Sequence, residues 1–263
     1  MKKYFVLGNP IKHSLSPLLH NYWIRKKNIE AVYEKKKIDD EDLKNLILEI
    51  KEKKISGINV TVPFKKKIIP YLEKLSPEAN STQSVNTIFL DKDKVTGHNT
   101  DIFGFEFGIR KTKFNISNKE ILILGAGGVV PSIIFALKKM NVSKIIVSNR
   151  TRTKAENLKN LFKDLNVINW GEIPNFDMVI NATSIGLKTE DEINLDFSKS
   201  GKDKFFYDLI YNPKETKFLK TGKNLGNITE NGKMMFIFQA SAAFKLWHGV
   251  QPEINEEVFK LLD

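Results

Sequence analysis

Short apolar runs alternate along the chain with stretches in which apolar residues recur every three or four positions. Short runs are typical of buried strands, and they predict strands at 4–7, 31–33, 57–62, 121–124, 144–147, 178–181 and 205–209. The longer spacing is typical of helices, and it predicts them at 16–28, 43–50, 65–72, 102–111, 133–140, 153–163, 234–247 and 255–262. Two further strands, 87–90 and 94–96, predict a hairpin. Alternating strands and helices indicate an α/β protein with mostly parallel sheets.

The clearest unit is the stretch 120–150, EILILGAGGVVPSIIFALKKMNVSKIIVSNR. A buried strand leads into the glycine turn Gly125-Ala126-Gly127-Gly128, and a helix and a second β-branched run follow. Such a turn lets backbone N–H groups approach a pyrophosphate at a helix N-terminus. A glycine-rich connection without a ligand is the alternative, but the complete strand–turn–helix–strand pattern predicts a Rossmann-like unit that binds a dinucleotide.

The end of the second strand indicates which dinucleotide binds. NAD-binding units place an Asp or Glu about 20 residues after the glycines, where it binds the ribose 2′-hydroxyl. Here the strand ends at Ser148-Asn149-Arg150 without a carboxylate, and Arg152 and Lys154 follow. Since a guanidinium can pair with a 2′-phosphate, the sequence favours NADP over NAD. The alternative is that Arg152 and Lys154 are only a solvated helix start.

Composition narrows the class of protein. The chain has 263 residues, 41% hydrophobic and 28% charged, with a net charge of +11. The lysines are scattered and no basic-aromatic RNA-binding motif is present, so we expect a small-molecule substrate and not a nucleic acid. The absence of cysteine excludes disulfides and thiol catalysis. The four histidines lack zinc-site spacing, so no metal is expected. No apolar run is long enough for a membrane or a signal peptide, which predicts a cytoplasmic protein.

Polar residues also follow the predicted strands of the N-terminal part. Asn59 and Thr61 share one face of the strand 57–62, and Lys65 lies just beyond it. Asp101 follows the hairpin, and ligands of open α/β sheets bind outside the carboxyl ends of strands. Lys65 could be a surface lysine and Asp101 a helix cap. The alternative interpretation is that Asp101 faces a cleft and pairs with Lys65.

Two other stretches could likewise have either a structural role or a role in ligand binding. Ser14 and Ser16 lie between the first strand and the first helix, where hydroxyls and a helix N-terminus suit a carboxylate. Ser16 could equally be only the N-cap of that helix. Asn86 could be an amide ligand or a polar residue at the start of a strand.

Taken together, these stretches resemble the shikimate dehydrogenase family over essentially the whole chain. The matching segments, in order, are GNPIKHSLSPLLHN, GINVTVPFK, SVNT, GHNTDIFGF, LGAGGV, SNRTRTKAE, INATSIG, YNPKET and NGKMMFIFQASAAFKLWHG. Each segment alone is weak evidence for the family, but nine segments in the same order are specific to it.

The resemblance implies a two-domain oxidoreductase of the shikimate pathway that reduces 3-dehydroshikimate to shikimate with NADPH. It implies a substrate-binding and catalytic domain at 1–103 plus 234–263, and a Rossmann-like NADP-binding domain at 104–233. Lys65 and Asp101 match the catalytic pair. The positions that match substrate-binding residues are Ser14, Ser16, Asn59, Thr61, Asn86, Tyr211 and Gln239. Those that match cofactor-binding residues are Gly125, Ala126, Gly127, Gly128, Asn149, Arg150, Thr151, Lys154, Thr183, Leu209 and Gly232.

Some positions depart from the family pattern. Val130 is bulkier than the usual small residue at the third glycine position, Lys154 stands where arginine is common, and Leu187 stands where methionine is usual. Two alternative functions remain: an NAD-dependent quinate/shikimate dehydrogenase, and a non-catalytic dinucleotide-binding sensor. The expected assembly is a monomer or a homodimer.

Overall fold

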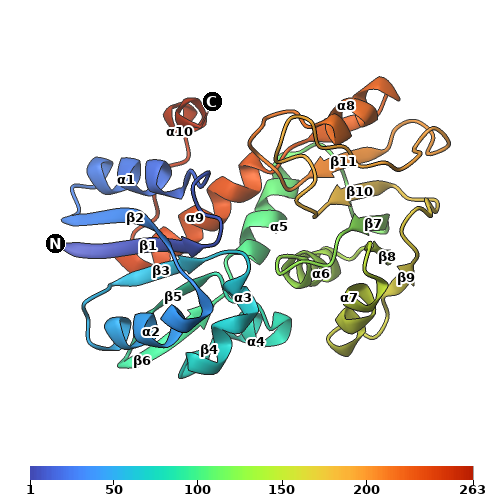
Figure 1. The fold of residues 1–263 in the computed structure, drawn as a ribbon. Coiled ribbons are helices and arrows are strands. Elements are labelled where there is room, and N and C mark those ends of the chain that lie inside the picture. Colours follow the sequence, from blue (N-terminus) through green and yellow to red (C-terminus); the bar gives the residue numbers. More distant parts are fainter. Residues whose placement is uncertain (263) are drawn as a thin grey trace. The chain divides into compact units, whose positions relative to one another are not determined.

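The computed structural model describes residues 1–262 (Figure 1). The chain forms two compact units, and each has its own six-stranded sheet. Unit 1 comprises Met1–Gly104 and the residues from Ile237 onward, and unit 2 comprises Phe105–Phe236. The two divisions fall within the helices α5 (Asp101–Lys111) and α9 (Lys233–His248). No helix among residues 1–262 has the length and apolarity that crossing a bilayer requires.

The sheet of unit 1 is mixed. Its strands are β1 (Lys2–Gly8), β2 (Ala31–Lys37), β3 (Gly57–Val60), β4 (Lys74–Leu75), β5 (Thr87–Asp91) and β6 (Lys94–His98). Their order is β2-β1-β3-β5-β6-β4. Strands β1, β2 and β3 are parallel, whereas β5 is antiparallel to both β3 and β6. The predicted hairpin is therefore present and supplies the antiparallel pairing.

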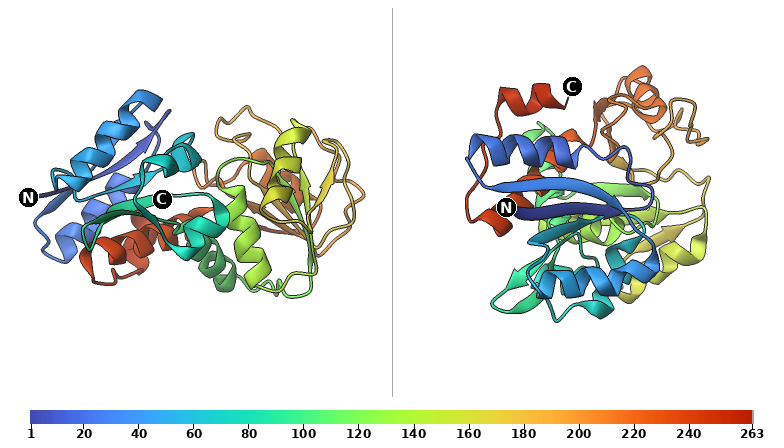
Figure 2. Two further views of the ribbon diagram at one scale, coloured as in Figure 1. Left: turned by 90° about the horizontal axis from the view of Figure 1, so that it is seen from below. Right: turned by 60° about the vertical axis from the view of Figure 1, so that its left-hand side comes forward.

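Helices cover both faces of this sheet (Figures 1 and 2). The helical segments of unit 1, besides parts of α5 and α9, are α1 (Ser16–Lys26), η1 (Asp40–Asp42), α2 (Leu43–Lys51), α3 (Phe64–Lys67), η2 (Ile69–Tyr71), α4 (Pro77–Thr82) and α10 (Glu256–Leu261). The apolar stripe of α2 joins a core with Ile58 and Val60 of β3. On the opposite face, Trp247 of α9 packs its ring against Tyr4 of β1 and Tyr33 of β2.

Strand register brings three chain segments to one edge of this sheet. Asn59 near the end of β3 pairs with Thr87 at the start of β5. Thr87 in turn pairs with His98 at the end of β6. The segments that follow β3 and β6 and precede β5 therefore converge at this edge.

The sheet of unit 2 is entirely parallel. Its strands are β7 (Glu120–Leu124), β8 (Lys144–Ser148), β9 (Asn166–Ile168), β10 (Met178–Asn181), β11 (Phe205–Asp208) and β12 (Ile228–Glu230). Read from one side, the order is β9-β8-β7-β10-β11-β12, which is the Rossmann order. The helical segments are α6 (Val130–Lys139), α7 (Arg152–Glu156), η3 (Asn157–Asn160) and α8 (Lys217–Asn224). Phe176, Phe197, Phe206 and Phe218 pack together in its core.

The α/β class and the two-domain architecture are confirmed, but some boundaries are wrong. Helix α1 begins at Ser16 itself, so Ser16 does not cap it, and Ser14 Oγ accepts the Ser16 N–H instead (3.3 Å). Strand β3 ends at Val60 because a turn follows, in which the Phe64 N–H bonds Thr61 O. The helix predicted at 153–163 ends at Glu156 and continues as a 3₁₀ turn. The pattern also missed the elements β4, α4, β9, α8 and β12.

Candidate active site

Lys65 and Asp101 form a buried ion pair where the segments that follow β3 and β6 converge at the sheet of unit 1. Lys65 lies on α3 just after β3, Asp101 begins α5 just after β6, and Lys65 Nζ lies 2.5 Å from Asp101 Oδ2. The two residues are only 8% and 5% exposed. Removing one partner of such a pair leaves an uncompensated buried charge, so each holds the other in place. Within residues 1–262 this is the only hydrogen bond of the Lys65 ammonium, which has three donors.

Asn86 orients the carboxylate of this pair. Its Nδ2 donates to Asp101 Oδ1 and to Thr100 Oγ1, both at 2.9 Å. Its Oδ1 accepts the backbone N–H of Thr100 at 2.7 Å. Asn99 Oδ1 accepts the N–H of Asp101 (3.1 Å) and thus holds the start of α5. The ion pair therefore sits in a polar network with defined donors and acceptors.

The other predicted substrate residues have varied surroundings. Gln239 Oε1 on α9 lies 3.5 Å from Asn86 Nδ2. Ser14 Oγ and Ser16 Oγ hydrogen-bond each other at 3.2 Å. Thr61 is half-buried in the turn after β3 and does not lie on that strand. Tyr211 belongs to unit 2, where its ring stacks on Phe236 at 4.4 Å.

Asn59 is part of the buried network and not of an open surface. Its Oδ1 accepts the Tyr33 hydroxyl at 2.7 Å, and its Nδ2 donates to Asn86 O and Thr87 Oγ1 at 3.0 Å each. Both amide hydrogens are therefore used within the protein. The expected face shared by Asn59 and Thr61 is lost, because the strand ends between them.

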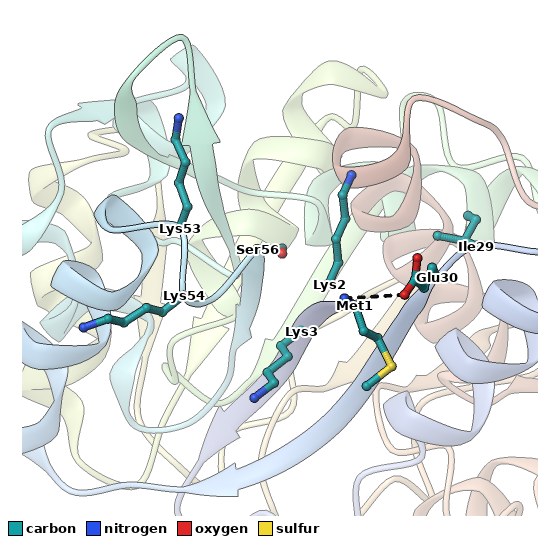
Figure 3. A pocket seen from close by; sticks show the side chains of 8 residues that line it. All are labelled: Met1, Lys2, Lys3, Ile29, Glu30, Lys53, Lys54 and Ser56. Atoms are coloured by element: carbon teal, nitrogen blue, oxygen red, sulfur yellow. Dashed lines mark ion pairs between the residues drawn. The ribbon is translucent and has the colours of Figure 1, made fainter.

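A surface hollow of about 400 Å³ lies elsewhere in unit 1, near the starts of β1 and β3. It is lined by Met1, Lys2, Lys3, Ile29, Glu30, Lys53, Lys54 and Ser56. Figure 3 shows its lysine side chains pointing apart rather than toward a common centre. The Met1 amine pairs with Glu30 at 3.7 Å. The hollow therefore lacks convergent groups, and the chemistry of unit 1 lies at the opposite strand ends.

In unit 2 the glycine turn lies at the topological switch point of the sheet, between β7 and β10. Gly125 has φ +114°, and a Cβ there would come within 2.8 Å of Ala182 O, so only glycine fits. Gly127 and Gly128 are exposed just before α6, and Ala126 is half-buried. Dinucleotides bind at this point of a Rossmann sheet. Val130, the bulky residue of this turn, is fully buried in α6.

The loop after β8 carries exposed cations. Arg150 and Lys154 are exposed, and within residues 1–262 neither forms an ion pair. Arg152 differs, because its guanidinium bonds Glu156 at 3.1 Å and Asn169 Oδ1 at 2.6 Å. Arg152 is therefore already paired within the protein, whereas Arg150 and Lys154 have no ion pair in the described part of the chain. Thr151 is the N-cap residue of α7, and its carbonyl accepts from Asn149 Nδ2 at 2.8 Å.

A second buried network ties together the loops after β10 and β11. Asp208 accepts from Asn181 Nδ2 and the Ile210 N–H at 3.0 Å each, and from Thr216 Oγ1 at 2.6 Å. Asn181 Oδ1 accepts both the N–H and the hydroxyl of Thr183. Burial, opposed by these donors, raises the pKa of Asp208 to about 6.

The remaining predicted cofactor residues follow β11 and β12. Leu209 directly follows β11, and Gly232 lies between β12 and α9. A Cβ on Gly232 would come within 2.1 Å of Leu209 O, so this approach requires glycine. The predicted cofactor residues thus all follow the carboxyl ends of strands of unit 2.

Sequence reasoning missed several members of the two networks. Tyr33, Thr87 and Thr100 take part in unit 1, and Asn181 and Asp208 take part in unit 2. A usable signal was present for the last two, since each is a polar residue that ends an apolar strand. No local signal marks Tyr33, because its partner Asn59 is 26 residues away.

A Rossmann sheet commonly binds a dinucleotide, and a buried ammonium can deliver a proton to a reacting oxygen. The two features together are typical of nicotinamide-dependent oxidoreductases. Comparison with known proteins identifies the family. A family model for the shikimate dehydrogenase substrate binding domain matches residues 6–88. A second, for shikimate / quinate 5-dehydrogenase, matches residues 108–216.

Relatives and solved structures agree with the family models. The shikimate dehydrogenase (NADP(+)) of Pelagibacter ubique (strain HTCC1062) is 59% identical over 264 residues, with 100% of each chain covered. The crystal structure of shikimate dehydrogenase from Aquifex aeolicus has a TM-score of 0.91 and 38% identity, covering 100% of this chain and 97% of that one. The Thermus thermophilus enzyme in complex with NADP(H) and shikimate has a TM-score of 0.89 and 29% identity, with the same coverage. This chain belongs to the shikimate dehydrogenase family.

Proposed function

We propose that Lys65 and Asp101 are the catalytic pair of an NADP-dependent shikimate dehydrogenase. The activity, reversible reduction of 3-dehydroshikimate to shikimate in the shikimate pathway, follows from family membership and from relatives that carry this name over the whole chain. The observation that supports the residue assignment is the buried ion pair at 2.5 Å, whose ammonium keeps unused donors.

The pair suits the proton chemistry of ketone reduction. NADPH, when bound, supplies a hydride to the ketone carbon. Negative charge then develops on the ketone oxygen, and Lys65 Nζ stabilises it and gives it a proton. Asp101 holds the ammonium in place through Oδ2 while Asn86 holds Oδ1. In the reverse direction Lys65 Nζ accepts the proton of the substrate hydroxyl.

The assignment of the units follows from these residues. We assign substrate binding and catalysis to unit 1 and NADP binding to unit 2. In unit 2, the Gly125 turn accommodates a pyrophosphate, and Arg150 and Lys154 are available for the 2′-phosphate. Ser14, Ser16, Thr61, Asn86 and Gln239 of unit 1 are assigned to the substrate, and the role of Tyr211, which belongs to unit 2, stays a prediction from the family resemblance. The cytoplasmic location and the monomeric or homodimeric state stay predictions.

Rate assays with four substrate and cofactor pairs test the function. Shikimate and quinate are each combined with NADP and with NAD, and the fastest turnover is expected for shikimate with NADP. Faster turnover of quinate with NAD would instead favour the catabolic alternative. No turnover with any pair would favour a dinucleotide-binding sensor.

The Lys65→Ala variant tests the catalytic assignment. We expect kcat to fall by more than about a hundredfold with a much smaller change in the KM for shikimate, because the missing group acts on the developing charge. Lys66→Ala is the matched control, since Lys66 is an exposed neighbour on the same helix. If kcat of Lys65→Ala stays within about fivefold of the wild type, Lys65 is not the catalytic group.

A further inference from the structure

A continuous chain of buried hydrogen bonds runs from Tyr33 to the Lys65–Asp101 pair. Tyr33 lies on β2, and its hydroxyl crosses over β1 to reach Asn59 Oδ1 on β3 at 2.7 Å. Asn59 Nδ2 donates to Asn86 O and to Thr87 Oγ1. Asn86 Nδ2 then donates to Asp101 Oδ1. Tyr33 is 1% exposed and Asn59 is 7% exposed, so water does not replace these bonds.

The donors and acceptors of this chain are directional. The Tyr33 hydroxyl donates to Asn59 Oδ1, which leaves both hydrogens of Asn59 Nδ2 for Asn86 O and Thr87 Oγ1. Thr87 Oγ1 accepts from Asn59 and so turns its own hydrogen to Asn86 Oδ1 at 3.1 Å. Asn86 Oδ1 accepts from Thr87 Oγ1 and from the backbone N–H of Thr100 at 2.7 Å, so its Nδ2 faces the carboxylate. The reversed amide would place an oxygen against Asp101 Oδ1, which repels it.

The ring of Tyr33 stacks on the ring of His20. The two rings stack 4.2 Å apart at an angle of 4°, and neither ring nitrogen of His20 has a hydrogen-bond partner among residues 1–262. Burial, with a smaller contribution from His248, lowers the pKa of His20 to about 3, so His20 is neutral at physiological pH. The stack therefore aims the hydroxyl without adding charge near the network.

We propose that the Tyr33 hydroxyl is a positioning group for catalysis: through Asn59 and Thr87 it supports the orientation of Asn86 that the Thr100 N–H also fixes, and through Asn86 that of Asp101 and Lys65. This inference rests on the proposed function of the Lys65–Asp101 pair. It also gives Asn59 a supporting role behind Asn86, in place of the direct substrate contact that the family resemblance implies.

The Tyr33→Phe variant removes only the hydroxyl and keeps the ring on His20. We expect kcat to fall about threefold to tenfold, the range for losing one buried neutral hydrogen bond, with the KM for NADPH unchanged. Rates are normalised to active sites counted by NADPH titration. Tyr4→Phe is the matched control. Tyr4 pairs with Tyr33 in the β1–β2 register and is similarly buried, but its hydroxyl interacts with Ser56 and not with the network.

A double-variant cycle separates positioning from general structural damage. Because Tyr33 acts through Asn59, Tyr33→Phe should cost no further kcat in an Asn59→Ser background. The proposal is overturned if the two losses add fully. It is also overturned if Tyr33→Phe stays within twofold of the wild type, or falls no further than Tyr4→Phe. These last two comparisons decide the matter even if Asn59→Ser does not fold.

Failure of the inference and failure of the proposed function give different results. A wild-type enzyme that does not oxidise shikimate with NADP contradicts the function itself. An active wild type that loses its rate in Lys65→Ala but not in Tyr33→Phe contradicts only the role of Tyr33.

Discussion

Each sheet carries a buried carboxylate at the carboxyl ends of its strands, and the two carboxylates have different surroundings. Asp101 in unit 1 is bonded by a lysine ammonium and by Asn86. Asp208 in unit 2 is bonded by Asn181, the Ile210 N–H and Thr216, and no cation pairs with it within residues 1–262. Both residues are at most 5% exposed, so burial alone does not distinguish them.

Under the proposed function, the difference separates a carboxylate that positions a catalytic ammonium from one that organises loops. In unit 1 a cation and an anion are buried together, which keeps an ammonium available where charge develops in the reaction. In unit 2 the carboxylate has only neutral donors, and burial raises the pKa of Asp208 to about 6. The unpaired cations of unit 2, Arg150 and Lys154, are exposed on another loop. Asp208 therefore organises the loops, while the exposed cations are available to an anionic ligand.

The largest effect that tests this comparison is expected for Asp101→Asn. The amide keeps an acceptor for Lys65 but removes the negative charge, so Lys65 loses its counter-ion and its position. We expect kcat to fall by about a hundredfold or more, equivalent to about 3 kcal/mol of transition-state stabilisation. Steady-state kinetics with shikimate and NADP measure it. An equal fall in Asp208→Asn would break the comparison, because it would make the second carboxylate as reactive as the first.

A smaller, pH-dependent effect on stability is expected for Asp208→Asn. The folded chain holds the Asp208 proton more tightly than the unfolded chain, since the pKa is raised from 3.8 to about 6. Asp208 therefore adds stability as the pH falls through 6, opposite to a carboxylate in an ion pair. The free energy of unfolding of the wild type, minus that of the variant, should rise by about 1 kcal/mol between pH 7.5 and pH 5. Urea unfolding at both pH values measures this; a constant difference would show that folding does not shift the pKa of Asp208, and a falling difference that folding lowers it.

An effect of similar size, confined to cofactor binding, is expected for Arg150→Ala. Losing a guanidinium that pairs with the 2′-phosphate should raise the KM for NADPH about tenfold, or about 1.4 kcal/mol, and leave the KM for NADH nearly unchanged. Arg152→Ala is the matched comparison, because Arg152 is already paired with Glu156 and should matter less. Equal changes for NADPH and NADH would remove the 2′-phosphate role from Arg150.

The spacing of apolar residues predicted much of this fold, because the side chains in apolar runs are the ones that the fold buries. The runs 121–124 and 178–181 are apolar on both sides, as strands covered on both faces must be, and both are strands here. Short edge strands such as β9 and β12 were missed because one side of each faces polar surroundings and little apolar pattern remains. Similarly, α8 is rich in lysine and is set by the Thr216 cap rather than by a long stripe.

The pairing of Lys65 with Asp101 could be expected from polar residues after two strands, and the family resemblance strengthened it. The orientation of that pair could not be predicted. It depends on Tyr33, Asn59 and Asn86, which are far apart in the sequence and meet only through strand order and register. The separation of Arg152 from Arg150 likewise depends on Asn169, a residue of a loop that no pattern placed.

The place of α9 in the chain has a consequence for protein synthesis. Trp247 of α9 packs against Tyr4 and Tyr33, so the aromatic face of the first sheet depends on residues that are synthesised after unit 2. Unit 2 lies wholly between the two parts of unit 1 and can complete its own sheet before the second of these parts is synthesised. A nascent chain released before residue 237 would carry Lys65 and Asp101, yet its first sheet would expose the surface that α9 covers. Such a fragment should therefore be bound by chaperones instead of being active.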